Sequence, residues 1–297
     1  MSSPWTTYTG MDFLRKPTDD EIDVAGMTHQ GKVRKSNQDQ FLICSLRRQI
    51  EIFDSSLTDT TRLRAPEERL AFLAMVADGV GGGAMGEEAS RLAIEIITEY
   101  VTRSTRCFYT ADASDDRAFA ETLQEAAMQT HQGILQQAQA DPARTGMATT
   151  LTLWLGVWPR AYLLQVGDSR YYTLHEGQLR QVSRDQTMAQ ELIESGVIRK
   201  SDPAAARWSH VLSSAIGGKQ TAPMVTRLDQ NWGDVHLLCS DGLTKHVPDQ
   251  QIRERLLNMN SAPEVCAQLV QDALDGGGTD NVTVIVGRAV KRDNASR

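Results

Sequence analysis

The sequence predicts a single α+β domain in which antiparallel strands are layered against pairs of helices. Short segments rich in β-forming residues group into three blocks, and pairs of segments with helical periodicity separate or follow these blocks. The connections at 158–160 and 175–178 are too short for a crossover helix, so the strands that they join should be antiparallel. No internal repeat or low-complexity linker divides the 297 residues, which makes one layered domain the simplest architecture.

The first half of the chain supplies an extension, a block of strands and a pair of helices. Residues 1–21 are polar and aperiodic, and we expect them to form a flexible extension before a domain at 22–291. Strands are expected in IDVAGMT, DQFLICSL, QIEIF and RLAFLAMVA, and helices at 87–106 and 116–140. The helical faces are expected to be Leu92, Ile96 and Tyr100 in the first helix, and Phe119, Leu123, Ala127 and Ile134 in the second.

The second half repeats this alternation of strands and helices. Strands are expected in MATTLTLWLGV, AYLLQVGD and RYYTLHEGQLRQV, and a polar, less regular region at 186–221 contains one helical piece at 189–195. The third block contains PMVTRLD and DVHLLCSDG. Helical segments at 248–258 and 261–274 then precede a last strand, NVTVIVGRAV.

Composition excludes several classes of function. The formal net charge is −7, with no Lys/Arg cluster longer than a pair, so nucleic acid is not an expected partner. We expect no membrane helix, because no apolar run reaches 18 residues, and no secretory signal at the N-terminus. Four scattered cysteines without a C-x-x-C pair suit reduced thiols, so we expect a cytoplasmic protein, and a monomer.

Five aspartates stand where strand-like segments begin or end, mostly beside glycine. Any one of them could be ordinary turn chemistry, but five in one chain indicate a crowded acidic site at one end of the sheets. Carboxylates brought together repel one another, so such a cluster must bind protons or metal, and all-oxygen ligands favour Mg²⁺ or Mn²⁺. The five are Asp39, Asp78, Asp168, Asp241 and Asp280.

A metal site of this kind suits the hydrolysis of phosphate monoesters. Two ions about 4 Å apart can lower the pKa of a bridging water from ~15.7 toward ~7, which supplies hydroxide at neutral pH. Arg34, five residues before Asp39, is the nearest candidate for a cation that meets the phosphate oxygens.

The motifs around these residues resemble the metal-dependent (PPM, or type 2C) Ser/Thr protein phosphatases in their bacterial form. RKSNQDQF resembles the R-x-x-N-E-D-x-F box, and VADGVGG resembles D-G-x-G-G. GMATTL, VGDSR, CSDGL and GGTDNVTVIV match four further family motifs. Each motif is weak alone, but the six occur in family order from about residue 24 to 287.

The resemblance implies a four-layer α/β/β/α sandwich of two antiparallel sheets with helix pairs outside, and a binuclear Mn²⁺/Mg²⁺ site between the sheets. Asp78 would bridge both ions, and Gly79 would offer its carbonyl oxygen to one of them. Asp241 and Asp280 would complete the coordination of one ion. The implied activity is the hydrolysis of phosphoserine and phosphothreonine in proteins phosphorylated by a Ser/Thr kinase.

The resemblance also implies supporting roles. Asp39 would hold metal-bound water, and Asp168 would join Asp241 at the third ion known in bacterial relatives. Arg34 would bind the substrate phosphate, and residues 183–217 fall where the family has its flap, which influences substrate choice.

The chain departs from the family pattern near the expected site. Gln38 replaces the usual acidic residue, so we expect weaker metal affinity with activity retained. Val80 and Gly83 stand where relatives carry a histidine proposed as general acid, which leaves the source of the leaving-group proton open. Asp185-Gln186-Thr187 replaces the common Asp-His-Ser of the flap. Three other histidines, His29, His210 and His246, lie near the motifs and are expected to be surface or packed residues.

Two other interpretations compete with an active phosphatase. A catalytically silent PPM-like module for binding or regulation would fit Gln38 and the missing histidines, but not the retained metal-site aspartates. A nucleotide-dependent oxidoreductase would use the G-x-G-x-x-G at 81–86, but Glu99 lies in a helical pattern and the next strand begins only near 146. Cysteine-based phosphatase chemistry is excluded, because no cysteine begins a C-x₅-R motif.

Overall fold

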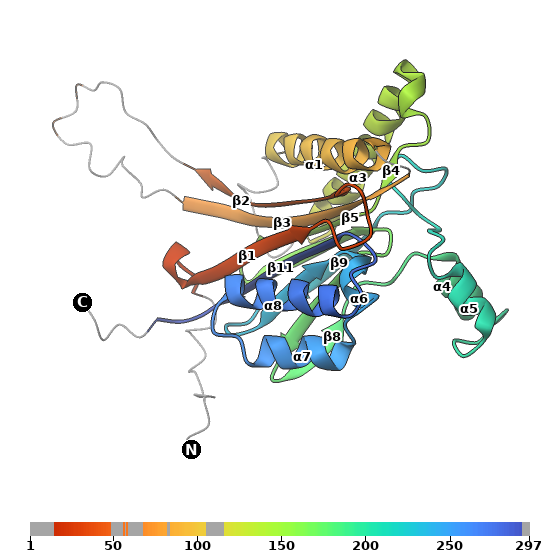
Figure 1. Ribbon diagram of the computed structural model, residues 1–297. Helices are drawn as coiled ribbons and strands as arrows, with labels where there is room; N and C mark the ends of the chain where they lie inside the picture. Colours follow the sequence, from red (N-terminus) through yellow and green to blue (C-terminus); the bar gives the residue numbers. More distant parts are fainter. Residues whose placement is uncertain are drawn as a thin grey trace.

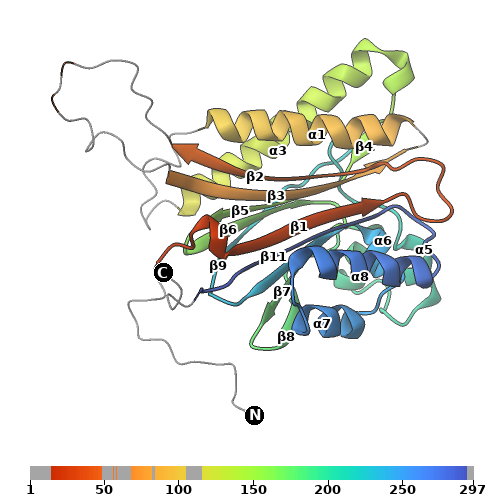
Figure 2. The ribbon, with the colours of Figure 1, turned by 60° about the vertical axis from the view of Figure 1, so that its left-hand side comes forward.

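The computed structural model describes residues 15–48, 68–81, 84–104 and 116–292, and the single positions 56 and 58. In these residues two antiparallel sheets lie face to face, and helices cover the outer face of each sheet (Figures 1 and 2). The observed architecture is the four-layer α+β sandwich that the sequence predicts.

Each sheet combines strands from both halves of the chain. The five-stranded sheet has the order β1 (Ile22–His29), β11 (Val282–Ala289), β10 (Val235–Cys239), β7 (Arg170–His175) and β8 (Gln178–Gln181). The six-stranded sheet has the order β2 (Asp39–Arg48), β3 (Glu68–Val80), β5 (Leu151–Val157), β6 (Arg160–Val166) and β9 (Met224–Asp229), with β4 (Ala148–Thr149) paired to β3. The two short connections join antiparallel neighbours, β5 to β6 and β7 to β8, as their lengths require.

The helix pairs supply the outer layers. Helices α1 (Ala84–Arg103) and α3 (Asp116–Ala140) cover the six-stranded sheet, and α7 (Asp249–Leu257) and α8 (Ala262–Asp275) cover the other. The predicted face of α3 is buried. In α1 the buried face is not the predicted one: it contains small residues, which let the helix approach the sheet closely, and the larger residues of the predicted face lie half-buried beside it. The buried residues of α1 include Ala89, Ala93, Ile97 and Val101, with Leu92, Ile96 and Tyr100 at the edge.

The polar region between β8 and β9 contains two short helices. The expected helical piece is α4 (Met188–Glu194), but α5 (Pro203–Trp208) was not predicted. Its start follows ordinary capping rules, because the Asp202 side chain accepts a hydrogen bond from the backbone N–H of Ala204 at 2.9 Å and Pro203 occupies the first turn. The expected strand QIEIF lies outside the described residues.

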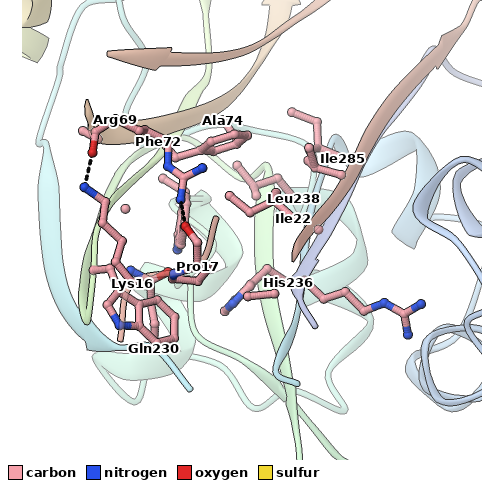
Figure 3. Close-up of a pocket in the computed structure, with 18 of the residues that line it drawn as sticks. Lys16, Pro17, Ile22, Arg69, Phe72, Ala74, Gln230, His236, Leu238 and Ile285 are labelled. Atoms are coloured by element: carbon pink, nitrogen blue, oxygen red, sulfur yellow. Dashed lines mark hydrogen bonds between the residues drawn. The ribbon is translucent and has the colours of Figure 1, made fainter. Parts of the chain in front are cut away.

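The inner faces of the two sheets pack on each other through a core that includes Val76, Tyr171, Leu238 and Ile285. A cavity of about 80 Å³ opens in this layer at the end where Ile22 pairs with Ala289. Residues 15–21 lie across this end: the ammonium of Lys16 donates to the carbonyl of Arg69, and the guanidinium of Arg69 donates to the carbonyl of Pro17 (Figure 3). Asp280 precedes the opposite end of β11, so the acidic residues lie away from this cavity.

Candidate active site

Strand ends and short connections bring the predicted acidic residues together at one end of the sandwich. Four of the five carboxylates line a cavity of about 190 Å³: Asp78 near the end of β3, Asp168 between β6 and β7, Asp241 at the start of α6 (Asp241–Thr244), and Asp280 just before β11. Arg34 and Gly79 line the same cavity. The site is therefore assembled from both sheets.

The backbone of Asp78 is fixed by the GMATTL segment. The N–H of Asp78 donates to Oγ1 of Thr150 at 3.0 Å, and its carbonyl accepts hydrogen bonds from the Thr150 N–H at 2.8 Å and the Thr149 hydroxyl at 2.9 Å. Glycine is required at position 79, because a Cβ there would lie 2.2 Å from the carbonyl oxygen of Gly86 in α1. This contact gives Gly79 a structural reason that needs no bound dinucleotide.

Asp39 lies behind the cavity rather than in its lining. It pairs with Asp78 in the β2–β3 ladder and is only 1% exposed. Its Oδ2 accepts hydrogen bonds from Ser240 and Thr283, each at 2.7 Å, whereas its buried Oδ1 has no partner. Burial raises the pKa of Asp39 to about 6 in spite of these two bonds.

Asp168 follows a turn at Gly167 that Gln186 supports. Gly167 adopts a positive φ of 105°, a conformation that favours glycine. The side chain of Gln186 accepts the N–H of Gly167 at 2.8 Å, and the N–H of Gln186 donates to the Gly167 carbonyl at 3.0 Å. Burial, followed by the charge of Asp241, raises the pKa of Asp168 to about 7. Gln186 thus positions the turn that precedes Asp168.

Two cations lie among the carboxylates. Arg34 Nε is 2.7 Å from Oδ1 of Asp280, and its Nη2 donates to Oδ2 at 2.9 Å. Lys245 Nζ is 2.6 Å from Oδ2 of Asp241 and 2.7 Å from Oδ2 of Asp280. These pairs hold the pKa of Asp280 below its usual value, although burial acts in the opposite direction.

The donor set fits a divalent cation. Asp78 is buried among four other carboxylates, and burial together with their negative charges raises its pKa well above the usual value. Arg34 and Lys245 balance this negative charge only in part, and a divalent cation would balance more of it. Oδ1 of Asp241, like that of Asp39, is buried and lacks a partner. Among the described residues, no group of three His, Cys, Asp or Glu side chains is already arranged to hold a metal ion. Lys245 pairs with Asp241 and Asp280, and Arg34 pairs with Asp280. Oxygen ligands of this type suit Mn²⁺ or Mg²⁺.

The three histidines differ in their surroundings. His29 Nδ1 accepts the Gly31 N–H at 2.9 Å, and His246 Nε2 accepts the Thr279 N–H at 3.0 Å, so both hold backbone turns. His210 is exposed and lines the acidic cavity. Backbone pairing fixes its segment, because the Met188 N–H donates to the carbonyl of Val211 at 2.7 Å.

Comparison with known proteins places the chain in a family. The family model described as protein phosphatase 2C matches residues 55–275. A serine/threonine phosphatase named stp from Listeria monocytogenes is 31% identical over 222 residues, which cover 74% of this chain and 84% of that protein. The chain belongs to the protein phosphatase 2C family.

Solved structures of this family share the fold. The crystal structure of the serine/threonine phosphatase PstP from Mycobacterium tuberculosis aligns with a TM-score of 0.70 and 30% identity, over 91% of this chain and 99% of that one. The catalytic domain of PstP in complex with two manganese ions aligns with a TM-score of 0.69 and 31% identity, over the same shares. In sequence, PstP is 35% identical over 226 residues, 75% of this chain, but the match spans only 41% of PstP. No helix in the described residues is long and apolar enough to cross a membrane.

Several residues of this phosphatase-family site were not singled out by sequence reasoning. Lys245 follows Asp241 by four residues, the spacing at which helical neighbours meet, and this spacing was a visible signal. Ser240 and Thr283, which bond Asp39, carried no such signal, because their convergence depends on how β10 and β11 pair.

Proposed function

We propose that this chain is a metal-dependent protein phosphatase that hydrolyses phosphoserine and phosphothreonine. The observation that carries the proposal is the cavity in which Asp78, Asp168, Asp241 and Asp280 face Arg34. A phosphate monoester needs cationic charge on its oxygens and an activated water, and this cavity offers ligands for the cations together with a guanidinium. The PstP structure that contains two manganese ions supports Mn²⁺ or Mg²⁺ as cofactor, with two ions.

The acidic residues divide the work of holding these ions. Asp78 and the carbonyl of Gly79 are the proposed ligands from β3, and Asp241 and Asp280 complete the set from the other sheet. Asp168 with Asp241 offers a place for a third ion, and Asp39 acts from behind the cavity through its free oxygen. Bound ions would lower the pKa of water and neutralise charge that develops on the phosphoryl group.

Arg34 is the proposed phosphate-binding residue. Its side chain is 51% exposed, so the guanidinium reaches the cavity from its rim and is not locked in the core. The same fork that now spans both oxygens of Asp280 has the geometry that binds two oxygens of a phosphate. We assign Arg34 to orienting the phosphoryl group rather than to holding metal.

The departing serine or threonine needs a proton, and we assign its donation to His210, which lines the cavity. Imidazole is the side chain that most often acts as an acid or base near neutral pH. Val80 cannot serve, and Lys245 is a poor acid because Asp241 and Asp280 raise its pKa above the usual value. His210 is the one histidine among the described residues that line the cavity. In this role His210 would give a proton to the alcohol oxygen as the P–O bond breaks.

The natural substrates are proposed to be proteins phosphorylated by a Ser/Thr kinase in the cytoplasm, and the enzyme to act as a monomer. The free thiols Cys44, Cys239 and Cys266 agree with a reducing compartment. The relatives that match are named as phosphatases, which favours an enzyme over the catalytically silent alternative.

Phosphate release from a phosphothreonine peptide tests the proposal. The wild-type protein should release phosphate in Mn²⁺ and not in EDTA, and Asp78→Asn should lose this activity although its side chain keeps the same shape. Wild-type turnover that is equal in EDTA and in Mn²⁺, or full turnover by Asp78→Asn, would contradict the proposal.

A further inference from the structure

Lys245 places a positive charge at the centre of the acidic site. Its ammonium lies 2.6 Å from Asp241 and 2.7 Å from Asp280, the two carboxylates proposed to complete one metal site. Asp241 is the first residue of α6 and Lys245 is its C-cap four residues later, so one turn of helix brings the two side chains together. Its side chain is only 25% exposed, which makes this contact more than a surface ion pair.

An ammonium and a divalent ion cannot share these oxygens without strong repulsion. An ion held between Asp241 and Asp280 would come within a few ångströms of the ammonium that already contacts both carboxylates, and like charges at such a distance in a partly buried site repel each other. The same ammonium also lies close enough to Asp168 to oppose the rise of its pKa. Any ion that enters between these carboxylates therefore meets Lys245.

We propose that Lys245 is a tethered cation that occupies the metal position between Asp241 and Asp280 in the metal-free protein, and that an incoming ion must displace it. This inference rests on the proposed metal-dependent function. Lys245 has two opposite effects: it relieves carboxylate repulsion in the metal-free fold, and it lowers the affinity for the ion. The concentration of Mn²⁺ at which the enzyme becomes active is thus set in part by this side chain.

The position of Lys245 allows the exchange. Its long, flexible side chain leads out of a helix of four residues at the cavity wall, so the ammonium can swing toward solvent while Asp241 stays in place. Arg34, the other cation on Asp280, lies on a different segment and remains available for phosphate. Displacement of Lys245 therefore changes the metal site without removing the phosphate-binding group.

Calorimetric titration with Mn²⁺ tests the inference. Lys245→Met keeps a long side chain without its charge and should bind Mn²⁺ about tenfold more tightly than wild type, which corresponds to about 1.4 kcal/mol. Lys245→Arg keeps the charge and should stay within about threefold of wild type. Lys219→Met removes an exposed lysine outside the cavity lining and should leave affinity unchanged. In EDTA, Lys245→Met should also unfold at a lower temperature than wild type.

The outcomes separate the inference from the function on which it rests. Equal or weaker Mn²⁺ binding by Lys245→Met, with wild type binding normally, would overturn the inference and leave the phosphatase proposal intact. No Mn²⁺ binding by the folded wild-type protein would overturn both. If Lys245→Met does not fold without metal, Lys245→Gln is titrated in its place, and the same increase in affinity is required.

Discussion

In the metal-free protein, the buried carboxylates of the acidic site should lower stability as the pH rises from about 4 to 7. The cause is the group of buried carboxylates, of which Asp39 is the clearest case: it is 1% exposed and its pKa is raised to about 6. A carboxyl group whose pKa is higher in the folded state binds a proton more tightly when folded. Its contribution is complete below the unfolded pKa of 3.8 and is lost as the pH rises through about 6.

The size of the effect follows from the difference between the folded and unfolded pKa values of Asp39, which are about 6 and 3.8. A tenfold change in proton affinity corresponds to about 1.36 kcal/mol, so this difference costs the metal-free protein about 3 kcal/mol by pH 7. Asp168, whose pKa is raised to about 7, acts in the same direction and extends the loss toward neutral pH. The two carboxylates share neighbours, so their contributions do not simply add.

Urea unfolding in EDTA at a series of pH values measures this dependence. Burial also lowers the pKa of His236 to about 4, which makes stability rise over the same pH range, so the carboxylate effect is measured as a difference between two proteins. From pH 4 to 7 the free energy of unfolding of the wild-type protein should fall by about 3 kcal/mol relative to that of Asp39→Asn, which cannot ionise at this position. Glu21 acts in the opposite direction, because its pKa is lowered to about 2, chiefly by Arg15; its contribution is complete above the unfolded value of 4.5 and is lost as the pH falls toward 2, so it overlaps the measured range only near pH 4. A difference between the wild-type protein and Asp39→Asn that stays constant from pH 4 to 7 in EDTA, or that changes in favour of the wild type, would refute the reasoning.

Three substitutions give further predictions. Arg34→Ala should lower kcat/KM for a phosphothreonine peptide by about 100-fold without weakening Mn²⁺ binding, because it removes a donor to the phosphate and not a metal ligand; steady-state kinetics and calorimetry check the two parts. His210→Ala should lower kcat/KM for the same peptide by about 100-fold but spare p-nitrophenyl phosphate, whose leaving group needs no proton, and an equal loss on both substrates would exclude an acid role. Gln38→Glu should tighten Mn²⁺ binding, and unchanged affinity in calorimetry would contradict this. The same substitution should lower the free energy of unfolding, measured in urea, by about 1 kcal/mol, because the Gln38 amide donates a hydrogen bond to the carbonyl of Gly81 at 3.1 Å and a carboxylate cannot.

The layered fold was predictable because the evidence for it is local. Turns of fixed length at 158–160 and 175–178 determine strand direction, and the periodicity of 116–140 marks the buried face of α3. The face of α1 was harder to predict, because alanines such as Ala89 and Ala93 become core residues only when a sheet lies close by. A prediction of the buried face from hydrophobicity alone favours large apolar side chains over alanines.

The sequence predicted which carboxylates come together but not how they are arranged in the cavity. Motif order identified Asp78, Asp241 and Asp280 because each lies beside a strand end, and strand ends meet at the edge of a sheet. The sequence could not reveal that Asp39 lies behind the cavity, since its depth depends on the stacking of the two sheets. Nor could it show that His210, far along the chain in the flap, lines the same cavity.

Calorimetric titration of the wild-type protein and Asp78→Asn with Mn²⁺ tests most directly whether the acidic cavity is a metal site. Asp78 lies where both sheets contribute carboxylates, and burial among the neighbouring acids raises its pKa well above the usual value. The wild-type protein should bind two Mn²⁺ ions per chain at neutral pH, and Asp78→Asn should lose both at the same concentrations. Two ions bound equally well by Asp78→Asn, or none bound by the folded wild-type protein, would contradict the account.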